Sequence, residues 1–338
     1  MPSSENQLVR PAVATAPVVA AEADDVHDRK ARVLNLLSQG QSIAGLLIVC
    51  IIFTALSADF LTQYNLFNIL RQSAVTAILA AGMVFVIVTG GIDLSVGAVV
   101  AVSGTLTAGM LRDGLPIPAA IAIGLLVGLG FGLVNGVLVA VARMPAFIVT
   151  LGTMTVGSSV ALAYSQGLPI SNLPDGFTYL GQGAVGPIPV PVILAAVVAL
   201  IAGIVLKRTL IGRYAVAIGG GEQVAFLSGV NTARWKATVY AVMGLLAGFA
   251  GIVLAARQNS GQPTAGAGVE LMVIAAVVIG GTSLSGGRGS MWGAMIGTLL
   301  ITVINNGLNL LNVSPYYQGL LVGGLILAAV ALDRRNRR

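Results

Sequence analysis

The stretch Gly90-Gly91-Ile92-Asp93-Leu94-Ser95-Val96-Gly97 decides the fold of this chain. It follows a long apolar run, and an altered copy returns at 280–287 as Gly-Gly-Thr-Ser-Leu-Ser-Gly-Gly. A glycine pair followed by small polar residues breaks a helix and leaves backbone groups unpaired, which a membrane tolerates only where protein or a water-filled path supplies partners. Two such breaks, one in each half of an apolar chain, are typical of an internally duplicated transporter.

The composition makes lipid the solvent for most of the chain. Of the 338 residues, 56% are hydrophobic and only 9% are charged, whereas a soluble domain carries about a quarter charged residues. The long uncharged runs are continuous in Leu, Val, Ile and Ala, which favours helices over a barrel of alternating strands. We therefore predict an all-α polytopic membrane protein with broken helices, an internal pseudo-repeat and about ten spans. They are expected at 41–58, 73–91, 94–111, 116–141, 146–165, 188–206, 237–256, 266–281, 292–311 and 317–332.

The basic residues orient these spans. With the N-terminus inside, 15 of the 18 lysines and arginines lie on the inner side, and only Arg71, Arg112 and Arg257 lie outside. This positive-inside bias predicts that both termini are cytoplasmic. It also accounts for the net charge of +6 without a nucleic-acid partner. Residues 1–40 are expected to form a disordered cytoplasmic tail, 41–333 the transmembrane domain and 334–338 a basic cytoplasmic tail.

Several kinds of chemistry are excluded by what the sequence lacks. Cys50 is the only cysteine and His27 the only histidine, so disulfides within the chain, histidine-based catalysis and Cys/His metal clusters have no residues to use. The phosphate-binding pattern G-x-x-x-x-G-K-[ST] is also absent. We expect no catalytic residue, metal or bound cofactor in this chain. Energy for active transport would come from another subunit or an ion gradient.

Asp93 and Glu270 are the acidic residues expected at membrane depth, where a charge costs about 2.5–3.5 kcal/mol. Asp93 is placed to cap the helix that follows it, with assistance from Ser95, and direct contact with substrate or an ion is the alternative. The second copy of the motif has Ser283 in the equivalent position. Because serine is also a good cap but not a proton carrier, this exchange favours capping.

Uncharged polar residues form a second candidate set. Amides and hydroxyls in membrane helices either tie helices together or line a route for a hydroxyl-rich solute. The candidate residues of the translocation path are Asp93, Ser95, Asn135, Phe147, Thr150, Asn305, Asn306 and Asn309, with helix breaks at Gly90, Gly91, Gly280 and Gly281. A separate four-residue glycine repeat, 124, 128, 132 and 136, predicts one face of close helix contact.

Two loops are long enough to matter. The outer segment 166–187 is rich in Gly and Pro and is expected to be irregular. The inner segment 207–236 is basic and contains a short helix-like centre at 222–229. An isolated helix this short is unstable unless packed, so we expect it to dock into a cytoplasmic protein; lying on the membrane surface is the alternative.

The motifs together resemble a known family. The octapeptide 90–97, the stretches 145–153 and 217–220, the tract 275–289 and the run 306–310 are similar to the ribose-type permeases of bacterial ABC sugar importers. The resemblance covers roughly residues 45–333. It implies a permease homodimer in the bacterial inner membrane, cytoplasmic ATPase subunits that bind ATP and Mg²⁺, and a periplasmic sugar-binding protein.

The resemblance also suggests which residues contact the ATPase. Residues 223–229 resemble the coupling pattern E-A-A-x-x-x-G, with Gln223 and Val224 in place of its first two residues. The residues implied in coupling are Arg213, Glu222, Ala225, Phe226 and Gly229. Within 270–273, Met272 replaces an acid that is usual in the family. The leading hypothesis is an ATP-driven monosaccharide importer subunit for ribose, xylose, galactose or a related solute. The alternative is a secondary transporter that uses Asp93 or Glu270 for proton or sodium coupling.

Overall fold

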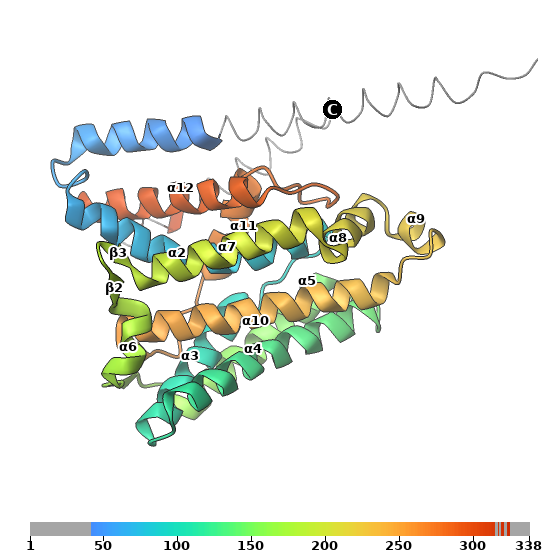
Figure 1. Ribbon diagram of the computed structural model, residues 1–338, viewed down its shortest axis with the longest axis horizontal. Coiled ribbons are helices and arrows are strands. Elements are labelled where there is room, and N and C mark those ends of the chain that lie inside the picture. The colour runs from blue at the N-terminus through green and yellow to red at the C-terminus, as the bar shows by residue number, and fades with distance from the viewer. Residues whose placement is uncertain (1–41, 315–316, 318, 321–322, 325–338) are drawn as a thin grey trace, which may run out of the picture.

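The computed structural model describes residues 42–314, 317, 319–320 and 323–324. The two expected tails and most of the expected last span, 317–332, lie outside these residues. The described chain is a bundle of helices that run roughly alongside one another (Figure 1). Its membrane-region helices are Ser42–Leu56, α2 Gln63–Val88, α3 Val96–Arg112, α4 Ile117–Ala140, α5 Ala146–Ser165, α7 Val190–Arg208, α10 Thr232–Gln258, α11 Val269–Ile279 and α12 Met291–Leu310.

The prediction of a helical, multi-pass membrane protein is confirmed, but not its number of spans. Six described helices are long and apolar enough to cross a membrane: α2, α4, α5, α7, α10 and α12. The span expected at 266–281 is reduced to α11, which has 11 residues. At 1.5 Å per residue this helix is about 16 Å long, roughly half of the hydrocarbon core. An irregular segment, 262–268, precedes it.

The start of α2 was predicted ten residues too late. Helix α2 begins at Gln63, because the Thr62 hydroxyl accepts a hydrogen bond from the Asn65 N–H at 3.3 Å. Its first part carries Asn65, Asn68, Arg71 and Gln72. These polar residues lie in the bundle and not in the outer loop to which Arg71 was assigned.

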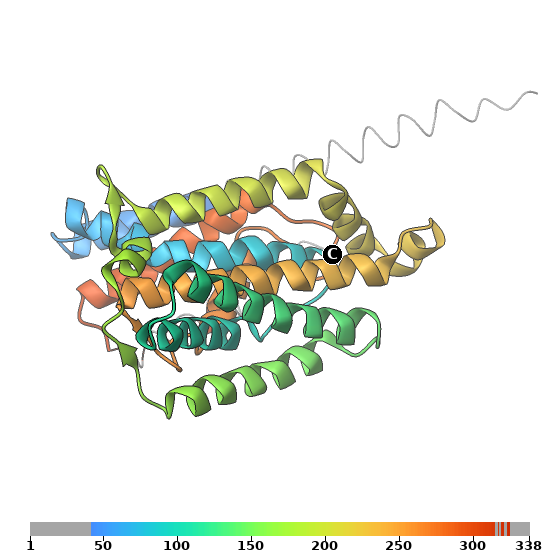
Figure 2. The same ribbon diagram turned by 60° about the horizontal axis from the view of Figure 1, so that its bottom comes forward.

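Helices α2 and α10 form the centre of the bundle and are mostly buried, whereas α4, α5 and α7 leave most of their surface exposed. Helix α5 forms one edge of the bundle in Figure 2. The glycine repeat of α4 packs directly on α10: a Cβ atom added to Gly128 would lie 2.5 Å from the Gly244 carbonyl oxygen, and one added to Gly132 would lie 3.0 Å from the Ala241 Cα. The predicted close helix contact is confirmed.

The two long loops lie at opposite ends of the bundle (Figure 1). At one end, called the α9 end below, the segment expected to hold one short helix contains two: α8 Leu210–Gly220 and α9 Glu222–Leu227. At the other, called the α6 end, the segment expected to be irregular contains α6 Asp175–Gln182 and short strands. Strand β1 Ile170–Ser171 pairs with β4 Ser260–Gly261, and β2 Ala184–Val185 pairs with β3 Ile188–Pro189.

Candidate functional site

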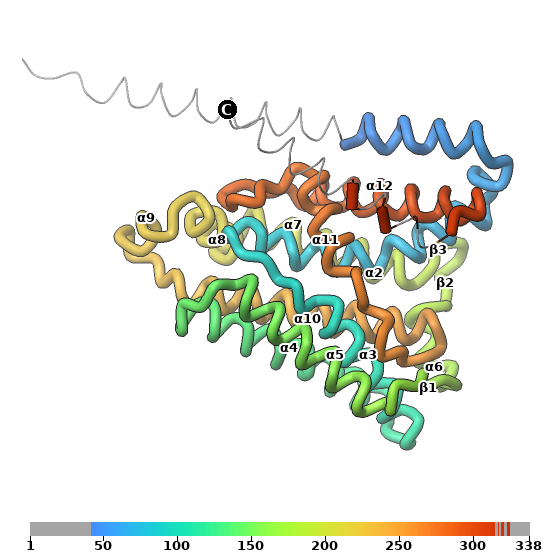
Figure 3. The backbone as a smooth tube through the Cα atoms, turned by 180° about the vertical axis from the view of Figure 1, so that it is seen from behind, coloured from blue at the N-terminus to red at the C-terminus, as the bar shows by residue number. Residues whose placement is uncertain are grey.

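The first glycine break ends α2 and turns the chain back into the bundle. Gly90 has φ +80°, which favours glycine. A Cβ atom on Gly91 would lie 2.6 Å from the Tyr240 hydroxyl oxygen, so the backbone passes close to α10. Residues 91–94 are not helical, and Figure 3 shows this segment from behind as it runs back along the bundle to α3.

The second break differs from the first in detail. Gly280 packs on the backbone of Gly293, and Gly281 has φ +89°. The next helix, α12, does not begin until Met291, and its N-cap is Ser290, whose hydroxyl accepts from the Gly293 N–H at 3.1 Å. The expectation that Ser283 caps this helix was therefore wrong. The segment between the helices is longer here, so the cap falls further along the chain.

The two motifs meet at the α9 end. The Gly287 N–H donates a hydrogen bond to the Val88 carbonyl oxygen at 2.9 Å. Helix α8 packs against both, because a Cβ atom on Gly219 would clash with the Val88 oxygen and the Gly287 nitrogen. We call the contact of Val88, Gly219 and Gly287 the glycine junction. Since α8 leads directly into α9, the junction joins both helix breaks to the inner loop.

Asp93 belongs to a buried polar network. Its Oδ1 accepts from the Ser95 N–H at 2.8 Å and from the Ser95 hydroxyl at 2.6 Å. The Asn135 amide donates to the Ser95 hydroxyl oxygen at 2.8 Å, and the Thr153 hydroxyl donates to the Asn135 Oδ1 at 2.7 Å. Asp93, Ser95 and Asn135 are each at most 1% exposed. The network ties α3, α4 and α5 together. The N-cap of α3 is Ser95, whose side chain makes no capping hydrogen bond, and Asp93 accepts from Ser95 rather than from an N–H inside the helix. The expected capping of α3 by Asp93 and Ser95 is therefore not seen, and the carboxylate instead holds the turn that precedes the helix.

Of the two α5 residues also expected on the path, Thr150 adjoins this network, because its hydroxyl lies 3.5 Å from the Ile92 carbonyl oxygen, whereas Phe147 points away from it. The buried Thr150 hydroxyl donates to the Ala146 carbonyl oxygen at 2.8 Å within α5. Phe147 is 57% exposed on the outside of α5. Neither residue lines either of the two cavities described below.

A second polar region lies in the α6 half of the bundle, between α2, α10, α11 and α12. It is a pocket of about 420 Å³ lined by Asn68, Arg71, Gln72, Thr76, Arg257, Met272, Thr302 and Asn305. The Arg257 Nη1 donates to the Arg71 carbonyl oxygen at 3.1 Å. The Arg71 Nε is buried and has no hydrogen-bond partner among the described residues. The pocket thus presents amides, hydroxyls and guanidinium groups, all of which can form hydrogen bonds with the hydroxyl groups of a solute.

Of the expected path residues, only Asn305 reaches this pocket. Asn306 instead pairs with Asn65, with amide-to-oxygen distances of 2.8 and 3.0 Å, and so ties α12 to α2. Asn309 is exposed. The α2 side of this pocket was not predicted, although the sequence contains a signal for it. Asn68, Gln72 and Thr76 are spaced four residues apart and share one helix face.

The inner loop presents an exposed apolar tip at α9. Val224, Phe226 and Leu227 are 69%, 62% and 77% exposed. Lys236 holds the base of the helix through a 2.8 Å ion pair with Glu222. Ala225, which the resemblance also implies in coupling, is 5% exposed, so it is buried beneath this tip.

Two further coupling residues flank this tip. Gly229 has φ +84° and ends the turn after α9, and Arg213 is exposed on α8. The side chain next to Arg213, Tyr214, stacks on Trp235 of α10 with ring centroids 5.0 Å apart. The inner loop is therefore anchored at both sides of its tip.

Residues 65–330 match the family model described as "Branched-chain amino acid transport system / permease component". The chain is 47% identical over 294 residues to the ribose import permease protein RbsC of Bacillus subtilis (strain 168), covering 86% of this chain and 91% of that protein. It is 44% identical over 305 residues to RbsC of Escherichia coli (strain K12), covering 89% and 95%. This chain belongs to the ribose-type permease family of ABC importers.

A third relative is the D-allose transport system permease protein AlsC of Escherichia coli (strain K12), 43% identical over 291 residues, which cover 86% of this chain and 89% of that protein. No solved structure matches the chain. As a member of the family, the chain is a multi-pass membrane component of a transport system rather than an enzyme.

Proposed function

We propose that two copies of this chain form the membrane path of an ATP-driven importer for a pentose or hexose sugar. The relatives named above are permeases for ribose and allose. The observation that carries the proposal is the polar pocket, where Asn68, Gln72 and Asn305 supply exchangeable hydrogen bonds within an apolar bundle. A neutral, hydroxyl-rich solute needs such bonds and no countercharge.

The remaining parts of the proposal follow from the two ends of the bundle. The exposed apolar tip of α9 suits a groove on a cytoplasmic ATPase, which would hold ATP and Mg²⁺. The α6 end then faces the periplasm and receives the sugar from a binding protein. This orientation agrees with the basic residues Lys207, Arg208, Arg213, Arg234 and Lys236 at the α9 end.

Ion-coupled transport is less well supported. Asp93 is held in its buried network by Ser95, and its position in the second motif is taken by Ser283. A buried carboxylate that accepts its hydrogen bonds from the neighbouring Ser95 fits a structural role in this turn better than a carrier of protons or sodium. The pocket of about 420 Å³ also contains no carboxylate among its lining residues.

The test is uptake of radiolabelled ribose, allose and arabinose into vesicles that contain the chain, its ATPase and its binding protein. Asn305→Leu replaces a pocket amide with an apolar side chain of similar size, and we expect uptake to fall at least tenfold, equivalent to about 1.4 kcal/mol. Thr54→Val is the control, because the Thr54 hydroxyl is exposed and bonds only within its own helix. Equal uptake by both variants would remove the pocket from the path.

A further inference from the structure

A second cavity, separate from the polar pocket, runs along α7 between α2 and α12. This groove has a volume of about 420 Å³. Small residues of α7, including Ala195, Ala199 and Gly203, leave the space, and Met291 and Met295 of α12 line the opposite wall. The groove is open along its side, because Leu200, Ile204 and Trp292 on its rim are 61%, 51% and 67% exposed.

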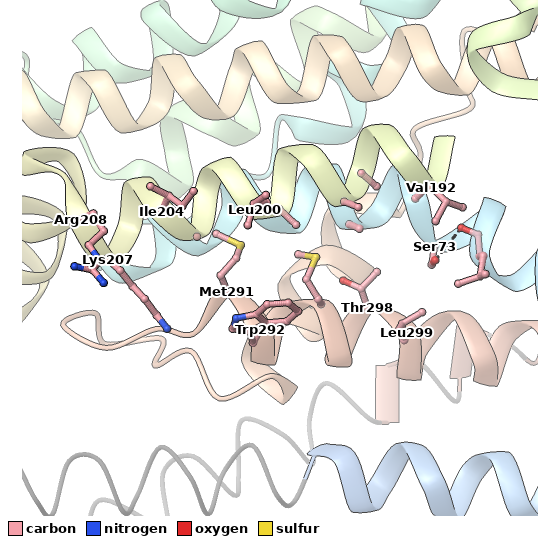
Figure 4. A pocket seen from close by; sticks show the side chains of 18 residues that line it. Ser73, Val192, Leu200, Ile204, Lys207, Arg208, Met291, Trp292, Thr298 and Leu299 are labelled. Carbon is pink, nitrogen blue, oxygen red and sulfur yellow. Dashed lines mark hydrogen bonds between the residues drawn. The ribbon is translucent and has the colours of Figure 1, made fainter. Parts of the chain in front are cut away.

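Its polarity is confined to one end. Lys207 and Arg208 occupy the last turn of α7, and Figure 4 shows both side chains at one end of the groove, with Trp292 between them and Leu299. Both are exposed, and neither has an ion-pair partner in the part of the chain that the structure describes. Aromatic and basic side chains of this kind collect where a bilayer meets water.

The rest of the groove offers no free polar group to a ligand. The Ser73 hydroxyl donates to the Leu70 carbonyl oxygen at 2.9 Å, and the Thr298 hydroxyl donates to the Ala294 carbonyl oxygen at 2.9 Å. A sugar would lose its hydrogen bonds there. The groove therefore fits a molecule that is apolar along most of its length and anionic at one end.

We propose that this groove binds an anionic phospholipid from the leaflet at the α9 end. The phosphate lies between Lys207 and Arg208, the Trp292 indole lies at the headgroup level, and one acyl chain follows the wall formed by Ala199 and Gly203. Clustered basic residues at a membrane surface recognise anionic headgroups in this way.

Charge argues for a lipid and against a second copy of the chain as the occupant. Among the described residues, Glu222 is the one exposed acidic side chain at the α9 end, and Lys236 already pairs with it. Asp59, Asp113 and Asp175 are at the α6 end, and Asp93 and Glu270 are within the bundle. The described residues of a second copy would thus bring no free carboxylate to Lys207 and Arg208, whereas a phospholipid supplies one phosphate.

The experiment measures contact between Trp292 and lipid. The full-length chain carrying Trp235→Phe has Trp292 as its single tryptophan. It is placed in phosphatidylcholine vesicles that contain a minor fraction of acyl-brominated phosphatidylglycerol or, in parallel, of acyl-brominated phosphatidylcholine. We expect stronger quenching by the brominated phosphatidylglycerol, with a preference of up to about 30-fold for two basic residues.

Three variants locate the site. Lys207→Gln with Arg208→Gln should reduce the preference to near one. Arg143→Gln with Arg234→Gln, the matched control, removes two exposed charges from the same end of the bundle and should leave it unchanged. Gly203→Leu should reduce quenching by both lipids, because a Cβ atom there meets only Met291 at 3.7 Å and the longer side chain fills the groove.

Two results would overturn the proposal. Equal quenching of the Trp235→Phe protein by the two brominated lipids would mean that the groove does not select an anionic headgroup. Absence of quenching by either lipid would mean that protein covers the groove, as a second copy of the chain would. Both results are measured on the Trp235→Phe protein, which has no substitution in the groove, so they do not depend on whether the groove variants fold.

Discussion

The glycine junction gives the sharpest test of how the helix breaks are held. In Gly219→Ala, the added Cβ atom would clash with the Val88 carbonyl oxygen and the Gly287 nitrogen, two backbone atoms that cannot rotate away. Relieving the clash moves α8 away from α2 and strains the hydrogen bond of 2.9 Å from Gly287 to Val88. Overpacking costs about 1–3 kcal/mol, and a lost hydrogen bond about 0.5–1.5 kcal/mol. We expect a loss of about 2–4 kcal/mol in the free energy of unfolding.

Its neighbour provides a matched control. A Cβ atom on Gly220 would have nothing within 4 Å, so Gly220→Ala makes the same chemical change one residue away without a clash. Because alanine is the better helix former, we expect it to be neutral or stabilising by up to about 1 kcal/mol.

The assay follows Trp235 fluorescence during thermal unfolding in detergent, in a Trp292→Phe background. Trp235 stacks on Tyr214 of α8 at 5.0 Å and so reports on the position of that helix. Gly219→Ala should lower the midpoint by several degrees and alter the native emission, and Gly220→Ala should do neither. Equal behaviour of the two variants would refute the close approach of α8 to the two breaks.

Three further predictions concern other parts of the bundle. Asp93→Ala removes the acceptor of two hydrogen bonds from Ser95 and should destabilise the protein by about 2–4 kcal/mol in thermal unfolding. Asp93→Asn keeps an acceptor oxygen and should retain most ATP-driven uptake. Complete loss of uptake in Asp93→Asn would favour a proton or ion role. Gly128→Val should separate α4 from α10 and lower the free energy of unfolding by about 1–3 kcal/mol. Gly130→Val on the same helix should leave that free energy unchanged, because a Cβ atom on Gly130 would have nothing within 4 Å. Similar melting curves for the two variants would contradict the packing of α4 on α10. Phe226→Ser at the exposed tip of α9 should weaken co-purification of the ATPase at least tenfold without lowering thermal stability. Leu61→Ser, similarly exposed at the α6 end, should leave co-purification of the ATPase intact. Undiminished ATPase binding by Phe226→Ser would place the contact elsewhere.

Local patterns in the sequence predicted the parts of the fold that depend on neighbouring residues. Long uncharged runs located most of the helices, and the repeat through Gly128 and Gly132 identified the contact of α4 with α10. The helix breaks were also recognisable from the two glycine pairs, and one glycine of each pair, Gly90 and Gly281, adopts positive φ. What could not be predicted was that the two breaks meet each other and α8, since this depends on tertiary packing.

The polar pocket was missed for a related reason. Arg71 and Gln72 interrupt the apolar run, so hydropathy alone predicts that the helix starts after them. The helix in fact starts at Gln63, after the cap at Thr62. The pocket also combines α2 with Thr302 and Asn305 of α12, more than 200 residues away in the sequence. Conversely, Asn135 and Asn306 have amide side chains of the kind expected to line a translocation path, but these amides form hydrogen bonds between helices.

The dependence of sugar uptake on ATP distinguishes an ABC importer subunit from a secondary transporter. Vesicles are prepared with the chain alone, and with the chain, its ATPase and its binding protein, and ribose uptake is measured with internal or external ATP and with an imposed proton or sodium gradient. We expect uptake only with all three components and hydrolysable ATP on the ATPase side, and no response to the proton or sodium gradient. Uptake by the chain alone under an ion gradient would contradict it.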